Sequence, residues 1–326
     1  MLSIFRTNQI IYNFLFVFYL LIIRFSYFFA NHTTINYPER ALWSSIPIDS
    51  WLSNGIFQMF IDLILLMGQA LIINNLVNKY RMTRDQSLFP GLMWILINNL
   101  FPDYFIHTPI LLANLFLLYG IAEMFAVYKK PEVIQSIFNI GLWLSTASLF
   151  YSGYIIFLVV GFLGMNILRA PKTREYLVLL IGCCVPYFLI FTYYYWNDNL
   201  TYFYQHQFVI PLGFSMFANA NIYLLIKVVI GFSLILMSLL IYNRINFKQS
   251  IQTNKYIQIL YWVLLLGGLM IFIQDSPGLD HLLVCAVPVA IILGMFINQI
   301  PLNWAEFFHF ILLANIFIWQ YGPLSK

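Results

Sequence analysis

The sequence predicts an all-α fold, a polytopic bundle of transmembrane helices without a large soluble domain. Two observations predict it. Hydrophobic residues make up 62% of the 326 residues and charged residues only 9%, whereas a typical soluble domain carries about 25% charged residues. Apolar runs of about 20 residues also recur along the chain, and this is the length of a helix that crosses a bilayer. Because a spanning segment must satisfy its own backbone hydrogen bonds, these runs are expected to be helical.

The apolar runs define about eleven candidate spans. The third and the fifth are short, and they are expected to be tilted or to cross only part of the bilayer. The longest polar stretches, 31–50 and 197–219, are too short for a soluble domain, so residues 1–326 are expected to form a single integral membrane domain. The candidate spans are 9–30, 51–75, 88–101, 105–127, 134–150, 152–168, 176–196, 220–242, 256–274, 282–298 and 304–320.

The basic residues predict the orientation, because Lys and Arg stay in cytoplasmic loops. With the N-terminus in the cytoplasm, twelve of the sixteen Lys and Arg residues fall into cytoplasmic loops. We therefore predict a multi-pass protein of the cytoplasmic (inner) membrane with a cytoplasmic N-terminus. The twelve residues are Arg6, Lys79, Arg81, Arg84, Lys129, Lys130, Arg169, Lys172, Arg174, Arg244, Lys248 and Lys255. Because topology explains them, they do not indicate nucleic-acid binding.

The acidic residues and histidines gather in the opposite, extracytoplasmic loops, which predicts that a polar site faces that side. One such stretch, residues 98–109 (NNLFPDYFIHTP), separates two apolar runs. Pro102 cannot continue the preceding helix, and a helical turn beginning at Asp103 would place Asp103 and His107 on one face. The pair would suit proton transfer or binding of a polar head group. The alternative is a re-entrant turn capped by Asp103.

The first outer loop holds a second group of candidates, Glu39, Arg40 and Asp49. Glu39 and Arg40 could act as a base and an anion clamp, or could form a surface ion pair only.

Charged residues inside spans are costly and are functional candidates by default. Arg24 lies near the outer end of the first span and is expected to snorkel outward, whereas Asp62 lies deeper in the second span. Lys227 lies about two turns into the eighth span, and it is expected to point into a polar cavity beside a carboxylate or a bound anion. The last span carries one Glu-x-x-His motif, Glu306 to His309. Metal sites in helical bundles use two such motifs. We therefore predict no metal site and no cofactor, and the alternative left open is a bound divalent cation.

Several longer motifs carry a resemblance. The stretches LFPGLMWILINNLFP, TPILLANLFLLYGIAEMF, IFNIGLWLSTASLFY and ILRAPKTREYLVLLIGCCVPYFLIFTYYYW resemble a family of uncharacterised bacterial inner-membrane proteins, best over residues 70–196. More distantly, the first half is similar to the GT-C superfamily of polyprenyl-phosphate-dependent glycosyltransferases. The chain departs from that superfamily in lacking the acidic pair soon after the first span and the large extracytoplasmic domain.

The GT-C resemblance implies a transfer reaction on a lipid-linked substrate such as a polyprenyl phosphate. Glu39, with Asp49 as the second candidate, would deprotonate an acceptor hydroxyl, and Asp103 would complete the acidic set. Arg40, His107 and Lys227 would stabilise the phosphate leaving group. The alternative is a non-enzymatic scaffold or channel subunit of an envelope-building membrane complex, and a transporter is the third possibility.

Overall fold

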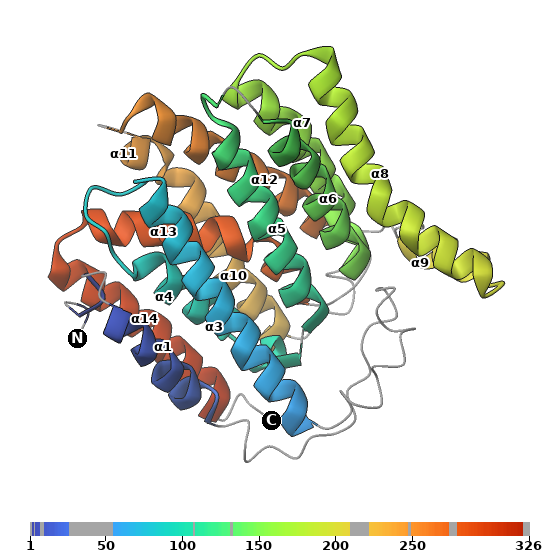
Figure 1. The fold of residues 1–326 in the computed structure, drawn as a ribbon. Helices are drawn as coiled ribbons and strands as arrows, with labels where there is room; N and C mark the ends of the chain where they lie inside the picture. Colours follow the sequence, from blue (N-terminus) through green and yellow to red (C-terminus); the bar gives the residue numbers. More distant parts are fainter. Residues whose placement is uncertain are drawn as a thin grey trace.

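The computed structural model is a bundle of helices that run side by side (Figure 1). It describes residues 2, 4–6, 10–25, 55–106, 108–130, 133–208, 222–246, 249–273 and 279–321. The elements are η1 (Ile4–Arg6), α1 (Ile10–Ile23), α3 (Gly55–Lys79), α4 (Phe89–Asn98), η4 (Pro102–Ile106), α5 (Thr108–Val127), α6 (Ile134–Phe150), η5 (Ser152–Ile156), α7 (Phe157–Leu168), α8 (Thr173–Trp196), α9 (Leu200–Gln207), α10 (Ile222–Leu240), α11 (Tyr242–Asn246), α12 (Ile251–Ile273), η7 (Leu279–Cys285), α13 (Ala286–Gln299) and α14 (Leu302–Tyr321).

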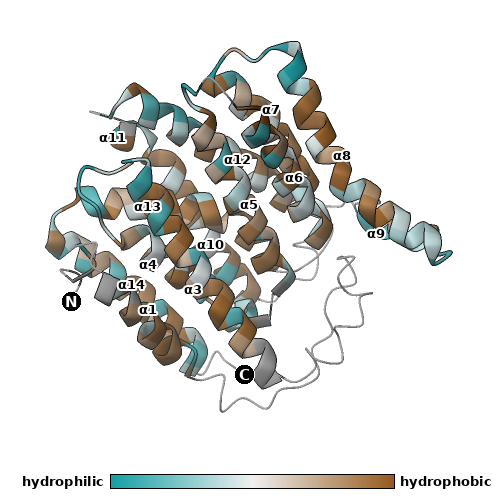
Figure 2. Ribbon diagram, in the orientation of Figure 1, coloured by the Kyte–Doolittle hydropathy of each residue, from teal (hydrophilic) through white to brown (hydrophobic). Residues whose placement is uncertain are grey.

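The all-α prediction is confirmed for the described residues, since none of them lies in a β-strand. Seven helical segments are long and apolar enough to cross a bilayer, and hydrophobic residues cover most of their length (Figure 2). They are α3, α5, α8, α10, α12, η7 with α13, and α14. Shorter apolar helices occupy α1, α4, α6 and the η5–α7 segment. Each predicted span therefore coincides with one apolar helix.

Two helices begin earlier than the sequence predicted. Helix α8 begins at Thr173 instead of 176, because the Glu175 carboxylate accepts the Lys172 backbone N–H at 3.1 Å and lies 2.9 Å from the Arg169 guanidinium. Helix α12 begins at Ile251 instead of 256, where the Thr253 N–H donates to the Ser250 hydroxyl. Capping of this kind stabilises a first helical turn that hydropathy alone assigns to a loop.

The centre of the bundle is formed by α4 and α13. All ten residues of α4 are buried, and so are most of those of α13. A Cβ atom at Gly294 would overlap the backbone of Pro90, so these two helices touch along their main chains. On its other side α4 is fastened to α3, since the Gly91 N–H donates to the Asn74 side chain at 2.7 Å.

A second close approach joins α6 to α8. A Cβ atom at Gly182 would meet the Phe138 carbonyl, and one at Gly141 would meet the Leu179 carbonyl. Small residues that allow helix backbones to approach in this way are typical of contacts between membrane helices.

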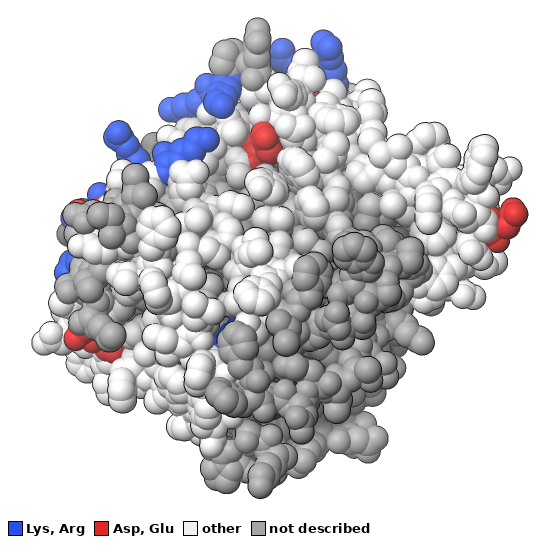
Figure 3. All heavy atoms as spheres, turned by 60° about the horizontal axis from the view of Figure 1, so that its bottom comes forward, with Lys and Arg blue, Asp and Glu red and all other residues white. Residues whose placement is uncertain are grey.

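The described basic residues of the loops gather at one end of the bundle. In Figure 1 the α3–α4 loop and α11 lie on the upper left of the bundle, and the α7–α8 loop lies at its top. In the space-filling view, Lys and Arg follow that edge, and the broad face beside them carries almost no charge (Figure 3). An uncharged band next to a basic rim is the surface expected of a bundle embedded in lipid.

Candidate functional site

The candidate site is built on the turn that ends α4. Two consecutive amides close the helix: Asn98 Nδ2 donates to the Trp94 carbonyl at 2.9 Å, and Asn99 Nδ2 donates to the Ile95 carbonyl at 2.7 Å. Ten helical residues span about 15 Å, roughly half the hydrocarbon thickness of a bilayer. The helix is therefore too short to cross a bilayer by itself, and η4 follows it after three residues.

A buried ion pair lies against this turn. The Arg24 guanidinium is 3.8 Å from the Asp62 carboxylate, and the two side chains are 1% and 0% exposed. Arg24 Nε also donates to Asn99 Oδ1 at 2.7 Å, and its guanidinium carbon lies 4.9 Å from the centre of the Phe105 ring. The expectation that Arg24 snorkels outward is therefore wrong. Asp62 lies about two turns into α3, and a buried carboxylate there holds the arginine inside the protein.

A second ion pair lies on the other side of the same turn. Lys227 Nζ, on α10, contacts Asp103 Oδ2, on η4. The two side chains are 16% and 44% exposed, so the carboxylate lies at the surface of the bundle. The carboxylate neighbour predicted for Lys227 is thus confirmed as Asp103, whereas the polar cavity around it stays a prediction.

Helix α14 supports the second pair with aromatic and amide contacts. Lys227 Nζ lies 5.0 Å from the centre of the Trp319 ring, in cation–π range. Trp319 stacks edge-on against Phe101 and donates from its indole to Asn315. Asn315 in turn donates to the Leu100 carbonyl. Four segments, α1, α3, α10 and α14, therefore meet at the turn.

We call Arg24, Asp62, Asn99, Asp103 and Lys227 the turn cluster. Its two cations and two carboxylates cancel formally, but the two pairs differ in what they can do. The Arg24–Asp62 pair is enclosed, and opening it would leave a buried charge without its partner. The Lys227–Asp103 pair is partly exposed, so an incoming anion can compete with Asp103 for the lysine.

The six predicted site residues fare unequally. Asp103 and Lys227 are brought into contact although 124 positions separate them. Glu39, Arg40, Asp49 and His107 lie outside the described residues. Sequence reasoning did not assign Asn99 or Trp319 to the site. The available signal for Asn99 was its position, an amide three residues before Pro102 at the end of a short apolar run.

The Glu306–His309 motif lies away from the turn cluster and has protein partners. Glu306 accepts the Leu2 N–H at 3.2 Å, and His309 Nε2 lies 2.6 Å from the Tyr19 hydroxyl. These contacts fasten α1 and the N-terminal segment to α14. Among the described residues, no three His, Cys, Asp or Glu side chains are grouped so as to hold a metal ion.

No protein-family model, curated protein or solved structure matches this chain. The resemblances to an uncharacterised inner-membrane family and to GT-C glycosyltransferases therefore gain no support from these comparisons, and the functional argument depends on the site alone.

Proposed function

We propose that the chain is an eleven-span protein of the cytoplasmic membrane that binds the phosphate head of a lipid-linked substrate at the turn cluster and transfers a group from it, in the manner of a GT-C enzyme. The N-terminus would lie in the cytoplasm and the turn cluster toward the extracytoplasmic side. One observation supports the proposal: a lysine within the apolar helix α10 is paired with a carboxylate that is 44% exposed.

The depth of Lys227 supports a ligand with an apolar tail. Lys227 lies more than one turn inside α10, and the neighbouring residues Ile226 and Val229 expose their side chains on the outside of the bundle. A prenyl chain lying along α10 would bring a phosphate to the level of the ammonium group. The phosphate would displace Asp103 from Lys227, and the freed carboxylate would remain beside the head group as part of the acidic set.

The remaining predicted residues keep their proposed roles. Glu39, with Asp49 as second candidate, would act as the base toward the acceptor. Arg40 and His107 would add positive charge around the leaving phosphate, where such charge stabilises the transition state.

A binding measurement tests the proposal. The purified protein in phosphatidylcholine nanodiscs is titrated with a polyprenyl phosphate and, separately, with the uncharged polyprenol of equal length. We expect the phosphate to bind preferentially, and Lys227→Met to weaken that binding by about tenfold, the equivalent of about 1.4 kcal/mol. Lys79→Met, which removes an exposed lysine at the opposite end of the bundle, is the matched control and should bind normally. Equal binding of the phosphate by wild type and Lys227→Met would overturn the proposal.

A non-enzymatic scaffold is the second candidate function, and a different observation favours it. Helices α8 and α9 extend from the side of the bundle (Figure 1), and α8 exposes large aromatic residues along its outer half, including Phe188, Tyr195 and Trp196. Such a surface suits lipid or another membrane subunit. Under this alternative, Phe188→Ala and Tyr195→Ala would release a co-purifying membrane protein, and Lys227→Met would not.

A further inference from the structure

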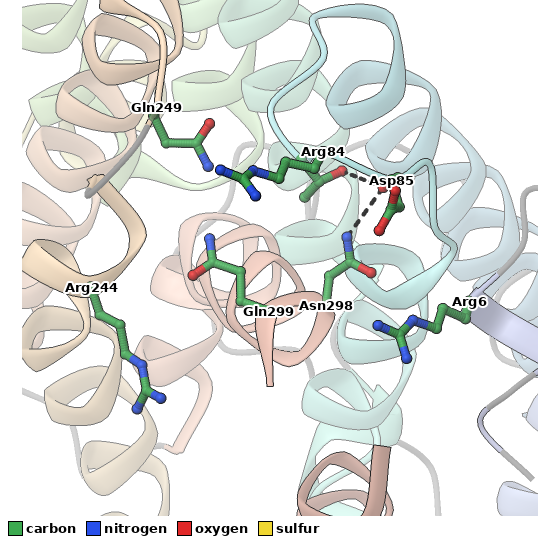
Figure 4. Close-up of a pocket in the computed structure, with 8 residues that line it drawn as sticks. Arg6, Arg84, Asp85, Arg244, Gln249, Asn298 and Gln299 are labelled. Atoms are coloured by element: carbon green, nitrogen blue, oxygen red, sulfur yellow. Dashed lines mark hydrogen bonds between the residues drawn. The ribbon is translucent and has the colours of Figure 1, made fainter. Parts of the chain in front are cut away.

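The basic end of the bundle contains a hollow of about 380 Å³ that is separate from the turn cluster. It lies where five segments meet: η1, the α3–α4 loop, α11, the start of α12 and the end of α13. Its lining is almost entirely polar, and Figure 4 shows the side chains around it. The lining residues are Arg6, Thr83, Arg84, Asp85, Arg244, Gln249, Asn298 and Gln299.

Three arginines line this hollow, and in Figure 4 the Arg244 side chain is directed away from Arg84 and Arg6. Arg84 extends toward the Gln249 amide, Arg6 extends toward the helix that carries Asn298, and Arg244 lies on the opposite side from Arg6 (Figure 4). Within the described part of the chain, no ion pair involves Arg6, Arg84 or Arg244. Among the described lining residues, three arginines and one aspartate give a formal charge of +2. The positive charge is thus concentrated in a concave site, where Asp85 offsets only one of the three arginines.

The walls of the hollow are fixed. Asn298 Nδ2 and the Thr83 hydroxyl both donate to the Asp85 carbonyl, at 3.1 and 2.9 Å. The Leu88 N–H donates to the Phe5 carbonyl at 2.9 Å, which joins the α3–α4 loop to η1. The Arg244 guanidinium carbon lies 5.4 Å from the centre of the Phe296 ring, in cation–π range. These contacts fix the backbone segments that carry the arginines.

We infer that this hollow binds a phosphate group with net negative charge, either the head group of an anionic phospholipid or a free phosphate compound. The arginine fork donates two parallel hydrogen bonds to phosphate oxygens, and this geometry favours phosphate over a simple point anion. The position at the rim of the apolar band suits a head group whose acyl chains descend beside the bundle, because basic pockets between membrane helices bind such lipids. This inference does not depend on the function proposed above.

Lipid binding by the purified full-length protein in detergent tests the inference. Phosphatidylglycerol and the zwitterionic phosphatidylcholine compete for the protein, and native mass spectrometry counts the retained lipids. We expect wild type to prefer phosphatidylglycerol, and the Arg84→Gln/Arg244→Gln variant to lose that preference by about tenfold or more. The Lys79→Gln/Arg174→Gln variant loses the same charge at the same end of the bundle outside the hollow, and it should keep the preference.

The opposing carboxylate gives a test in the other direction. Asp85→Asn removes the single negative charge of the lining while keeping the backbone carbonyl that Thr83 and Asn298 use, so phosphatidylglycerol should bind severalfold more tightly. All altered side chains are exposed, and unchanged elution from a size-exclusion column shows that each variant is folded. If the arginine variant and the control variant lose the preference for phosphatidylglycerol equally, the inference is overturned, because general surface charge would then explain that preference. Unchanged binding in all variants would overturn it as well.

Inorganic phosphate separates the two sources of the ligand. If millimolar inorganic phosphate displaces phosphatidylglycerol from wild type, the hollow takes free phosphate compounds. If inorganic phosphate does not displace phosphatidylglycerol from wild type, and the Arg84→Gln/Arg244→Gln variant has lost its preference for that lipid, the hollow takes a lipid head group. Either result supports the phosphate site.

Discussion

The Nε atom of Arg24 donates a hydrogen bond to Oδ1 of Asn99 at 2.7 Å, and this contact joins α1 to the end of α4. The same guanidinium faces Asp62 of α3. One cation therefore holds three helices together at a depth where an unpartnered charge would be strongly unfavourable.

Removing either member of this buried pair should destabilise the protein. We expect Arg24→Leu and Asp62→Leu each to lower the free energy of unfolding by about 3–5 kcal/mol, because each leaves one buried charge uncompensated. The double variant should lose less than the sum of the two, since neither charge then remains. Thermal unfolding in detergent measures all three variants, and strict additivity would contradict the pairing.

The exposed pair should behave differently from the buried one. Lys227→Leu should change the free energy of unfolding by only about 0–1 kcal/mol, because Asp103 is 44% exposed and water can solvate it. If the turn cluster is a site, Lys227→Leu and Asp103→Asn should lose polyprenyl phosphate binding at normal abundance. His107→Gln should do the same, and most strongly below about pH 6.5, where an unperturbed imidazole is charged. If all three variants bind polyprenyl phosphate as wild type does at every pH, residues 98–109 form a turn and not a binding site.

The membrane orientation is open to direct measurement. In a cysteine-free background, single cysteines placed next to Lys79, Lys129, Lys172 and Lys248 should react only with reagents that reach the cytoplasm. Cysteines next to Asp103, Asp198 and Asp280 should react from outside, because basic loops remain in the cytoplasm. Labelling of positions 103 and 129 from the same side would refute the span assignment.

The close contact of α6 with α8 predicts a position-specific effect of glycine replacement. Gly182→Ala should destabilise the protein by about 1–3 kcal/mol, because its Cβ would meet the Phe138 carbonyl. Gly268→Ala is the matched control within α12, where a Cβ has no atom within 4 Å, and it should stabilise the helix by about 0.5–1 kcal/mol. The melting temperatures of the two variants are compared. Equal shifts for Gly182→Ala and Gly268→Ala would argue against the close approach of α6 and α8.

The sequence predicts the helices far better than it predicts their contacts. Hydropathy locates the apolar helices because lipid leaves the backbone few alternatives. It does not report which way a helix is rotated, so the depth of Lys227 predicted a carboxylate neighbour but could not select Asp103 from the outer acidic residues. For Arg24 the same lack of rotational information led to the wrong environment, since its proximity to Asp62 depends on how α1 and α3 face each other.

The full burial of α4 has a consequence for how the chain is made. Ten residues are too few to settle in a bilayer as an independent span, and the surface that covers Pro90 belongs to Gly294. The ribosome completes that surface about 200 residues later, which takes on the order of ten seconds or more. During that interval α4 can pack on α3 but not yet on α13, so the nascent protein passes through a stage with an incomplete interior. An insertase or neighbouring chaperone that shields this stage would influence the yield of the protein without contacting any residue of its mature surface.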